Sequence, residues 1–315
     1  ILIGLVGSEM CIRDSNNVWR KENREVHKFL RAIGFSDITK KDLEMILDEV
    51  ITRPEIMKIT KDSEGNEFAE LSGSFAANAG ITVRGTYQED DSFHMDYYYP
   101  YVFGTSITTN EQIDVEKHAE KESYAGVCDE VNLGVTLIFY IQNVADYLAE
   151  TNRHLSKIHY GAMLAGLSTE GKILCPVVER KKNDVPAIQK NDRHNQLIAQ
   201  AREGDEDAIE SLTLEDMDTY ALLSQRVMKE DIFSIVKSTF MPFGIESDQY
   251  TVLGEIIDCV TMENKLTHEK LYGMKLLCNN IQFDVCINEK DLLGEPAIGR
   301  RFRGNVWMQG NLCLE

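Results

Sequence analysis

Two arginines and a tryptophan near the C-terminus form the pattern best suited to bind a ligand. In the stretch RRFRGNVWMQ, Arg301, Arg303 and Trp307 alternate with apolar residues, so a strand there places all three side chains on one face. Guanidinium groups beside an aromatic ring are typical of sites that bind single-stranded nucleic acid. However, residues 246–315 contain seven basic and eleven acidic side chains, whereas nucleic-acid-binding modules are usually basic. We therefore favour docking of this region onto the acidic helical segment before it, with single-stranded nucleic-acid binding as the alternative.

A histidine and an aspartate in the stretch FHMDYYYPY are the best candidates for acid–base chemistry. His94 and Asp96 are two residues apart, so on a strand they share a face and could act as a base and the group that orients it. Spacing indicates no third partner, so we expect a solvent-exposed strand face, with a hydrolase site around these two residues as the alternative. We expect no metal site and no cofactor, because the histidines and cysteines lack metal-ligand spacing.

The stretch GLSTEGKI, residues 166–173, matches part of a phosphate-binding loop. Gly171 and Lys172 occupy the glycine and lysine positions of such a loop. Ile173 replaces the hydroxyl residue that binds magnesium, and Pro176 follows where a helix should begin. We therefore predict a β-hairpin here, in which Gly171 takes a positive φ angle at the turn.

The composition limits the kinds of partner. The 315 residues carry a net charge of -19, so phosphate backbones and anionic membranes repel the chain, and a protein or small-molecule partner is favoured over nucleic acid or membrane. The seven cysteines are scattered without a C-x-x-C pair, which is typical of a reduced cytoplasmic protein. The longest apolar run, Val135 to Ile141, is far shorter than a membrane span.

The first 25 residues differ in character from the rest of the chain. Residues 5–15, LVGSEMCIRDS, resemble one reading frame of a transposase sequencing adapter. The residues that follow are polar and aperiodic, and Lys21 and Glu22 can be encoded by a ribosome-binding-site sequence. We therefore expect residues 1–25 to be a non-native leader and the native chain to begin at Val26.

Hydrophobic periodicity beyond residue 25 predicts an α+β protein. Residues 26–53 have helical spacing, with Thr39 and Asp42 as a capping box and Pro54 as the stop. From Ile56 onward the period changes to two, which is typical of antiparallel strands. The strand-like runs of the last seventy residues, punctuated by glycine, suggest a small barrel of the oligonucleotide/oligosaccharide-binding (OB) type. We expect an antiparallel-sheet N-terminal α+β domain (26–185), an acidic helical connector (186–245) and a C-terminal small OB-like β-barrel (246–315).

Four longer stretches are distinctive enough to indicate a family. They are HKFLRAIGFSDI, YGAMLAGLSTEGKILCPV, AREGDEDAIESLTLEDMDTYALLSQRV and DLLGEPAIGRRFRGNVWMQG. Together they resemble a clostridial family, domain of unknown function 3881, over residues 26–312. The resemblance implies a bacterial cytoplasmic protein and supplies no catalytic residues. Since the residues themselves indicate no catalytic set, we expect a non-enzymatic protein that acts by binding a protein or a small ligand.

Overall fold

The computed structural model divides the chain into two compact units, residues 1–173 with 238–315, and residues 174–237. The fold of the first unit is given below. The expected leader (1–25) and nearly all of the expected connector (186–245) lie outside the residues that the structure describes. The described residues are 26–90, 92–117, 122–152, 159–177, 200, 205, 207, 210, 211, 236–244 and 248–314.

Two helices precede the first strand. The 3₁₀-helix η2 (Lys28–Ile33) is followed by α1 (Lys40–Thr52), which begins after Thr39. The Thr39 hydroxyl accepts a hydrogen bond from the backbone of Asp42, as the capping pattern predicts. The apolar side of α1 packs on the first sheet, where Val50 lies against Gly73 so closely that a side chain at residue 73 would collide with it.

The first sheet contains four antiparallel strands in sequence order. They are β1 (Ile56–Lys61), β2 (Glu67–Ala76), β3 (Ala79–Tyr87) and β4 (Phe93–Val102). This is the arrangement that the period-two pattern predicts for this part of the chain.

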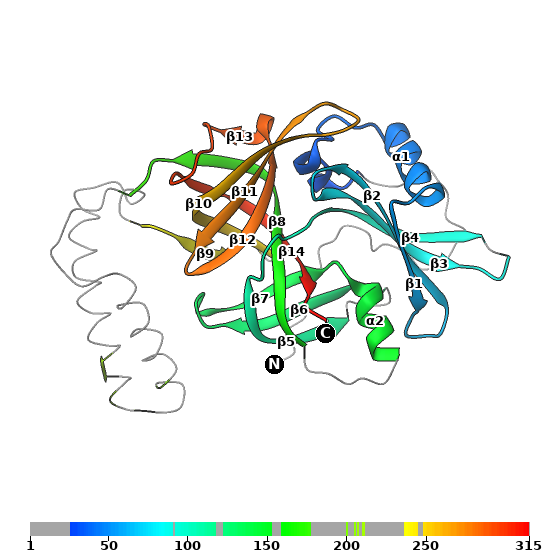
Figure 1. Cartoon of the computed structure of the whole chain (residues 1–315), viewed down its shortest axis with the longest axis horizontal. Helices are drawn as coiled ribbons and strands as arrows, with labels where there is room; N and C mark the ends of the chain where they lie inside the picture. Colours follow the sequence, from blue (N-terminus) through cyan, green and yellow to red (C-terminus); the bar gives the residue numbers. More distant parts are fainter. Residues whose placement is uncertain are drawn as a thin grey trace. The chain divides into compact units, whose positions relative to one another are not determined.

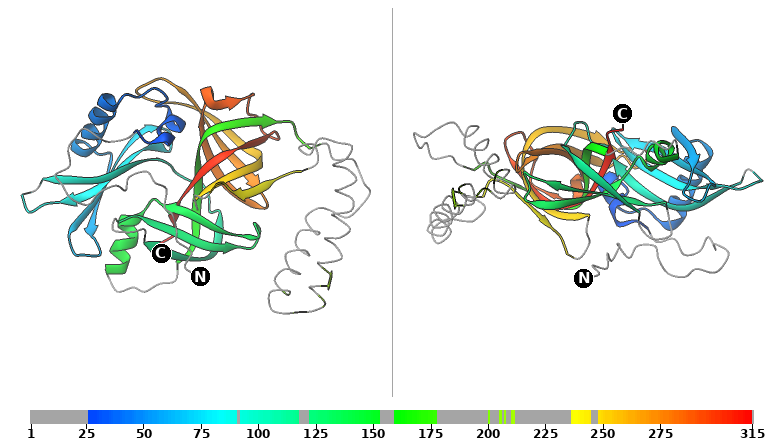
Figure 2. Two further views of the ribbon diagram at one scale, coloured as in Figure 1. Left: turned by 180° about the vertical axis from the view of Figure 1, so that it is seen from behind. Right: turned by 90° about the horizontal axis from the view of Figure 1, so that it is seen from below.

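The remaining strands form one larger sheet. Its first part is β5 (Thr109–Lys117), β6 (Tyr124–Glu130), β7 (Val135–Ile141), the helix α2 (Val144–Asn152) and β8 (His159–Leu174). Its second part is β9 (Thr239–Pro242), β10 (Gln249–Glu263), β11 (Lys270–Cys278), β12 (Ile281–Asn288), the 3₁₀-helix η3 (Glu289–Asp291), β13 (Leu292–Leu293) and β14 (Arg301–Leu312). Figures 1 and 2 show this sheet beside the four-stranded sheet.

The pairings in the larger sheet follow two closed paths. In the first ring, β5 pairs with β6 and β6 with β7, β7 runs parallel to β14, β14 pairs with β8, and β8 returns to β5. In the second ring, β10 pairs with β11 and β11 with β12, β12 runs parallel to β8, β8 pairs with β14, and β14 returns to β10. The long strands β8 and β14 therefore belong to both rings (Figure 1).

The hairpin predicted around Gly171 is wrong, because β8 is one continuous strand of 16 residues. Two glycines of β8 serve a different purpose. A side chain at Gly171 would collide with Phe302 of β14, and one at Gly166 would press on Val306 of the same strand. Gly166 and Gly171 are therefore needed for the close approach of the two shared strands and not for a turn.

The described residues are mostly in strands, with few helices. Strands from the expected N-terminal domain (26–185) and from the expected C-terminal barrel (246–315) lie in one sheet. The division of the chain into separately folding domains at these boundaries stays a prediction. Apolar side chains inside the rings form one core, and those between the rings, η2, α1 and the first sheet form another. Among the described residues, no helix has the length and apolar character that crossing a membrane requires.

Candidate functional site

A groove with a volume of about 380 Å³ opens between α1, the loop before it and the turn that joins β10 to β11. Its apolar lining consists of Phe35, Ile38, Met45, Ile46 and Leu266. Its charged lining consists of the four carboxylates of Asp37, Asp42, Glu49 and Glu269. No lysine or arginine of the described residues lines it. The groove therefore combines an apolar surface with a strongly negative one.

One face of α1 forms a wall of this groove. Asp42, Met45, Ile46 and Glu49 recur at i, i+3, i+4 and i+7, which places them in one stripe along the helix. Ile46 is buried at the bottom of the stripe, whereas Met45 is 56% exposed. Three other apolar side chains of the helix (Leu43, Leu47 and Val50) are buried in the core, and Ile51 is partly buried against it. Thus α1 uses one side for folding and presents an adjoining side to the groove.

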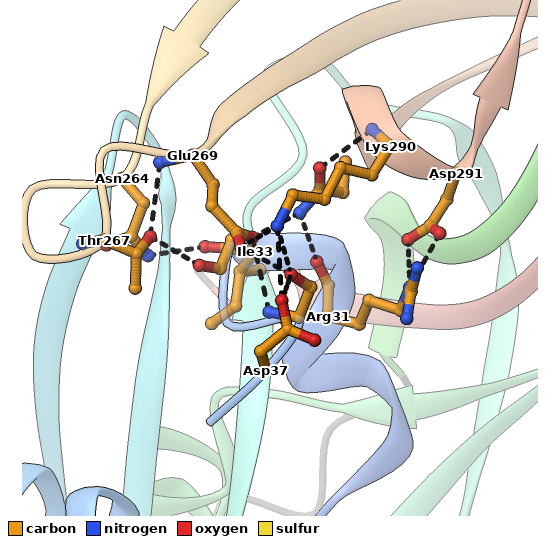
Figure 3. Close-up of polar contacts among 11 residues, drawn as sticks. Arg31, Ile33, Asp37, Asn264, Thr267, Glu269, Lys290 and Asp291 are labelled. Carbon is orange, nitrogen blue, oxygen red and sulfur yellow. Dashed lines mark hydrogen bonds and ion pairs between the residues drawn. The ribbon is translucent and has the colours of Figure 1, made fainter. Parts of the chain in front are cut away.

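The opposite wall is a turn, residues 264–269, that is fixed to η2. The side chain of Asn264 is buried and donates a hydrogen bond to the Ile33 carbonyl at 2.7 Å. Its Oδ1 atom accepts hydrogen bonds from the backbone N–H groups of Leu266 and Thr267. The Thr267 hydroxyl donates to the Gly34 carbonyl at 2.6 Å. These bonds, several of which are drawn in Figure 3, hold Leu266 at the rim, where it is 50% exposed.

Lys290 of η3 neutralises one end of the groove. Its ammonium group lies 2.6 Å from Glu269 Oε1, 2.8 Å from the Ser36 hydroxyl and 3.4 Å from Asp37 Oδ2 (Figure 3). Burial alone would raise the pKa of Glu269, but hydrogen bonds from Lys290, Ser36 and Asn288 outweigh it and lower the pKa. A hydrogen bond from Ser36, helped by Lys290, lowers the pKa of Asp37. Both carboxylates are therefore ionised at neutral pH.

A second ion pair attaches η2 to the second ring. The Arg31 Nε atom donates to both carboxylate oxygens of Asp291, at 2.6 and 2.5 Å (Figure 3). The Asn288 side chain of β12 donates to the Arg31 carbonyl at 3.2 Å and to Glu269 Oε2 at 2.6 Å. The groove thus lies where η2, the β10–β11 turn and η3 are connected by hydrogen bonds and ion pairs. In the described part of the chain, neither Asp42 nor Glu49 forms an ion pair with a lysine or arginine.

The structure places Trp307 in the interior. Its side chain is 7% exposed and stacks on Phe29 with ring centroids 5.2 Å apart, while His27 and Tyr140 lie 5.1 and 5.4 Å away. Its Nε1 atom donates to Asp248 Oδ2 at 2.8 Å. The ring faces are therefore occupied by the protein itself. The expected acidic docking partner lies outside the described residues, and the ligand-binding role of Trp307 stays a prediction.

The alternation predicted for β14 is confirmed, but its outer face is only partly open. Phe302, Val306 and Met308 are buried in the core inside the rings. On the outer face, Arg301 is buried and Arg303 is exposed. The two arginines and Trp307 therefore share a strand without forming one exposed platform, and the ligand-binding roles of Arg301 and Arg303 stay predictions.

His94 and Asp96 share a face of β4, as their spacing predicts. The His94 Nδ1 atom lies 3.6 Å from Asp96 Oδ1, which is longer than a hydrogen bond, and the two side chains are 42% and 30% exposed. Among the described residues, no group of three or more histidine, cysteine, aspartate or glutamate side chains could hold a metal ion. The pair thus resembles the solvent-exposed strand face that the sequence favours.

A buried arginine that the sequence analysis did not single out, Arg84, lies between the two sheets. The Arg84 Nε atom donates to Glu70 Oε1 at 2.7 Å, and its other nitrogens reach the hydroxyls of Tyr97, Tyr99 and Tyr140. It also donates to the carbonyls of residues 141 and 142. These bonds connect β3 to β7. Because the guanidinium is enclosed and fully hydrogen bonded, Arg84 is not accessible to a ligand. The signal available was a single charged residue in the apolar strand AGITVRGTY.

Comparison with family models matches residues 30–310 to a family described as "Domain of unknown function, E. rectale Gene description (DUF3881)". The chain belongs to this family. The resemblance inferred from the four stretches is therefore confirmed, and the matched range includes every residue that lines the groove. No curated protein and no solved structure matches the chain significantly.

Proposed function

We propose that this DUF3881 protein is a non-enzymatic, cytoplasmic binding protein whose groove takes a ligand that joins an apolar body to a positive charge. The observation that carries the proposal is the lining of the groove, where five apolar side chains lie beside four carboxylates. An apolar ligand surface is stabilised there by about 25 cal/mol for each Å² removed from water.

Charge determines which apolar ligands are accepted. The carboxylates disfavour an anionic ligand, since like charges brought together without water are costly. The net charge of -19 acts in the same direction at longer range, because it attracts cations toward the protein surface. Specificity for a cation and affinity for an apolar body therefore come from different residues of the same groove.

The proposal includes a finer description of the larger sheet as two OB-type barrels that share β8 and β14. Each ring has five strands, and each has a helix after its third consecutive strand, α2 in the first ring and η3 in the second. OB barrels are five-stranded, and they bind ligands with the second and third strands and with the loop between the first two. In the second ring that loop is the turn 264–269, a wall of the groove. This support is an analogy at the level of the fold.

The test uses two small probes with similar alkyl chains and head groups of opposite charge. We expect hexylammonium chloride to shift the methyl NMR signals of Met45 and Leu266, and sodium hexanoate at the same concentration to leave them unchanged. Methyl groups inside the rings, such as that of Met274, serve as internal controls because they are buried. Equal shifts with both probes, or none with hexylammonium, would overturn the proposal.

Two other functions have weaker support. A hydrolase site at His94 and Asp96 lacks a hydrogen-bonded pair in this structure. Single-stranded nucleic-acid binding through Arg301, Arg303 and Trp307 requires an indole face that Phe29 and His27 now cover. Both functions would need a rearrangement that the groove does not need.

A further inference from the structure

The two groove carboxylates that have no lysine or arginine partner among the described residues are far apart along α1. Asp42 and Glu49 are seven residues apart, and a helix rises 1.5 Å per residue, so they are separated by roughly 10 Å along the axis. Met45 and Ile46 lie between them on the same stripe. A single small cation cannot contact both carboxylates at once. The stripe is therefore negative, apolar, apolar and negative, in that order.

Building on the proposed groove function, we propose that the natural occupant is a helical segment of another protein that lies along α1. Its complementary pattern is a basic residue, two apolar residues and a second basic residue at i, i+3, i+4 and i+7. Helices that bind in grooves use this spacing for their anchor residues. Two basic side chains seven positions apart on such a helix are separated by the same distance as Asp42 and Glu49.

The open rim of the groove favours a protein segment over a small molecule. Sites for small molecules surround most of the surface of their ligand. Here Met45 and Leu266, on opposite walls, are each at least half exposed. An extended partner can cover both side chains, and methionine is well suited to such contacts because its side chain adapts its shape.

The position of Lys290 favours a bound segment whose axis follows α1. Lys290 already neutralises Glu269 and approaches Asp37 on the side of the turn. The negative charge that is left without a basic partner among the described residues lies on α1, at Asp42 and Glu49. A basic helix is therefore attracted along α1 and not across the groove toward Lys290.

The test uses three labelled synthetic peptides of about four helical turns. The matched peptide carries Lys, Leu, Leu and Lys at i, i+3, i+4 and i+7 on one face, the scrambled peptide has the same composition, and the third has Glu in place of Lys. Binding is measured by fluorescence anisotropy. We expect the matched peptide to bind at least roughly tenfold more tightly than the scrambled one, and more weakly as salt is added, with no binding of the Glu peptide.

Protein variants connect binding to the stripe. The double variant Asp42→Asn/Glu49→Gln should weaken the matched peptide by roughly tenfold. Glu49→Gln alone, which leaves the Thr39–Asp42 cap in place, should give part of this loss even if the double variant folds poorly. The matched control is Asp48→Asn, since Asp48 is exposed on the same helix but does not line the groove, and it should leave the affinity unchanged. Circular dichroism confirms that each variant is folded.

The possible outcomes separate the two proposals. Equal binding of matched and scrambled peptides, or an equal loss with Asp48→Asn, would show general attraction to an acidic surface and would overturn the helical segment. If hexylammonium shifts Met45 and Leu266 but the matched peptide does not bind, the groove function stands and the helical partner is wrong. If neither probe binds, both proposals fail.

Discussion

The residues that precede the first sheet bury one apolar surface and leave another one exposed. Around Trp307, His27 and Phe29 cover the indole and leave it 7% exposed. Along α1, the same part of the chain leaves Met45 56% exposed, and Leu266 on the opposite wall of the groove is 50% exposed. We call the first surface the sealed face and the second the open groove. The sealed face encloses its aromatic ring within the protein, whereas the open groove leaves two apolar side chains exposed to solvent.

Polar groups follow the same division. On the sealed face, Trp307 donates to Asp248, and the backbone N–H of His27 donates to the Tyr98 hydroxyl at 3.0 Å. In the open groove, Asp42 and Glu49 face solvent without a basic partner among the described residues. A sealed surface requires internal partners for its polar groups, whereas an open one can leave charge for a ligand.

The largest expected effect is on the sealed face. Trp307→Ala removes a buried ring and leaves a cavity between Phe29 and Tyr140, so we expect the free energy of unfolding to fall by about 3–5 kcal/mol in urea denaturation. Trp307→Phe keeps a stacked ring and loses the hydrogen bond to Asp248, so it should cost about 1 kcal/mol beyond any change in packing. A cost for Trp307→Ala as small as that of a surface substitution would show that the face is not sealed in solution.

An intermediate effect is expected from pH. Burial, followed by the charge of Lys28, lowers the pKa of His27 from 6.5 to about 3. In the unfolded chain His27 binds a proton near pH 6.5, whereas in the folded protein it stays neutral down to about pH 3. The contribution of His27 to the free energy of unfolding is therefore complete above pH 6.5 and is lost as the pH decreases toward 3. Between pH 7 and pH 5, His27 alone should remove about 1–2 kcal/mol.

The control for this pH effect is His27→Gln, measured by urea denaturation at the same two pH values. Contributions from the carboxylates, including Glu269 and Asp37, are common to both proteins and cancel in the difference. We expect the variant to lose less stability than the original chain between pH 7 and pH 5. Identical losses would show that water reaches His27 and that the sealed face opens at this end.

The smallest effect on stability belongs to the open groove. Met45→Ala and Leu266→Ala truncate half-exposed side chains, so each should change the free energy of unfolding by no more than about 0.5 kcal/mol. Thermal melts of the two variants beside Trp307→Ala give the comparison directly. A loss of several kcal/mol at Leu266 would mean that the groove is part of the core and not a binding surface.

Local patterns predicted the local structure well. Thr39 and Asp42 marked the start of α1, and the alternation of Phe302, Val306 and Met308 identified the inner face of β14. Gly171 misled because a glycine required by a close neighbour looks the same in sequence as a glycine required by a turn. Its neighbour Phe302 lies in a strand more than a hundred residues later, and no local rule points to it.

The candidate site was harder to predict for the same reason. The spacing of Asp42, Met45, Ile46 and Glu49 can be read from the sequence, but a stripe of this kind on a helix usually faces solvent. What makes it one wall of a groove is the turn at 264–269, which Asn264 attaches to η2 through a hydrogen bond to Ile33. Conversely, Trp307 has the residue type of a binding site, and its burial follows from contacts with Phe29, far away in the chain.

The sharing of β8 and β14 has a consequence for synthesis on the ribosome. Each ring includes β14, which is translated after every other strand of both rings. While residues 301–312 are still inside the ribosome, β7 and β10 both lack a neighbour, and neither ring can close. Such long-range pairing is slow because distant segments must first meet. Both rings should therefore gain their last strand in the same step, after β14 has left the ribosome.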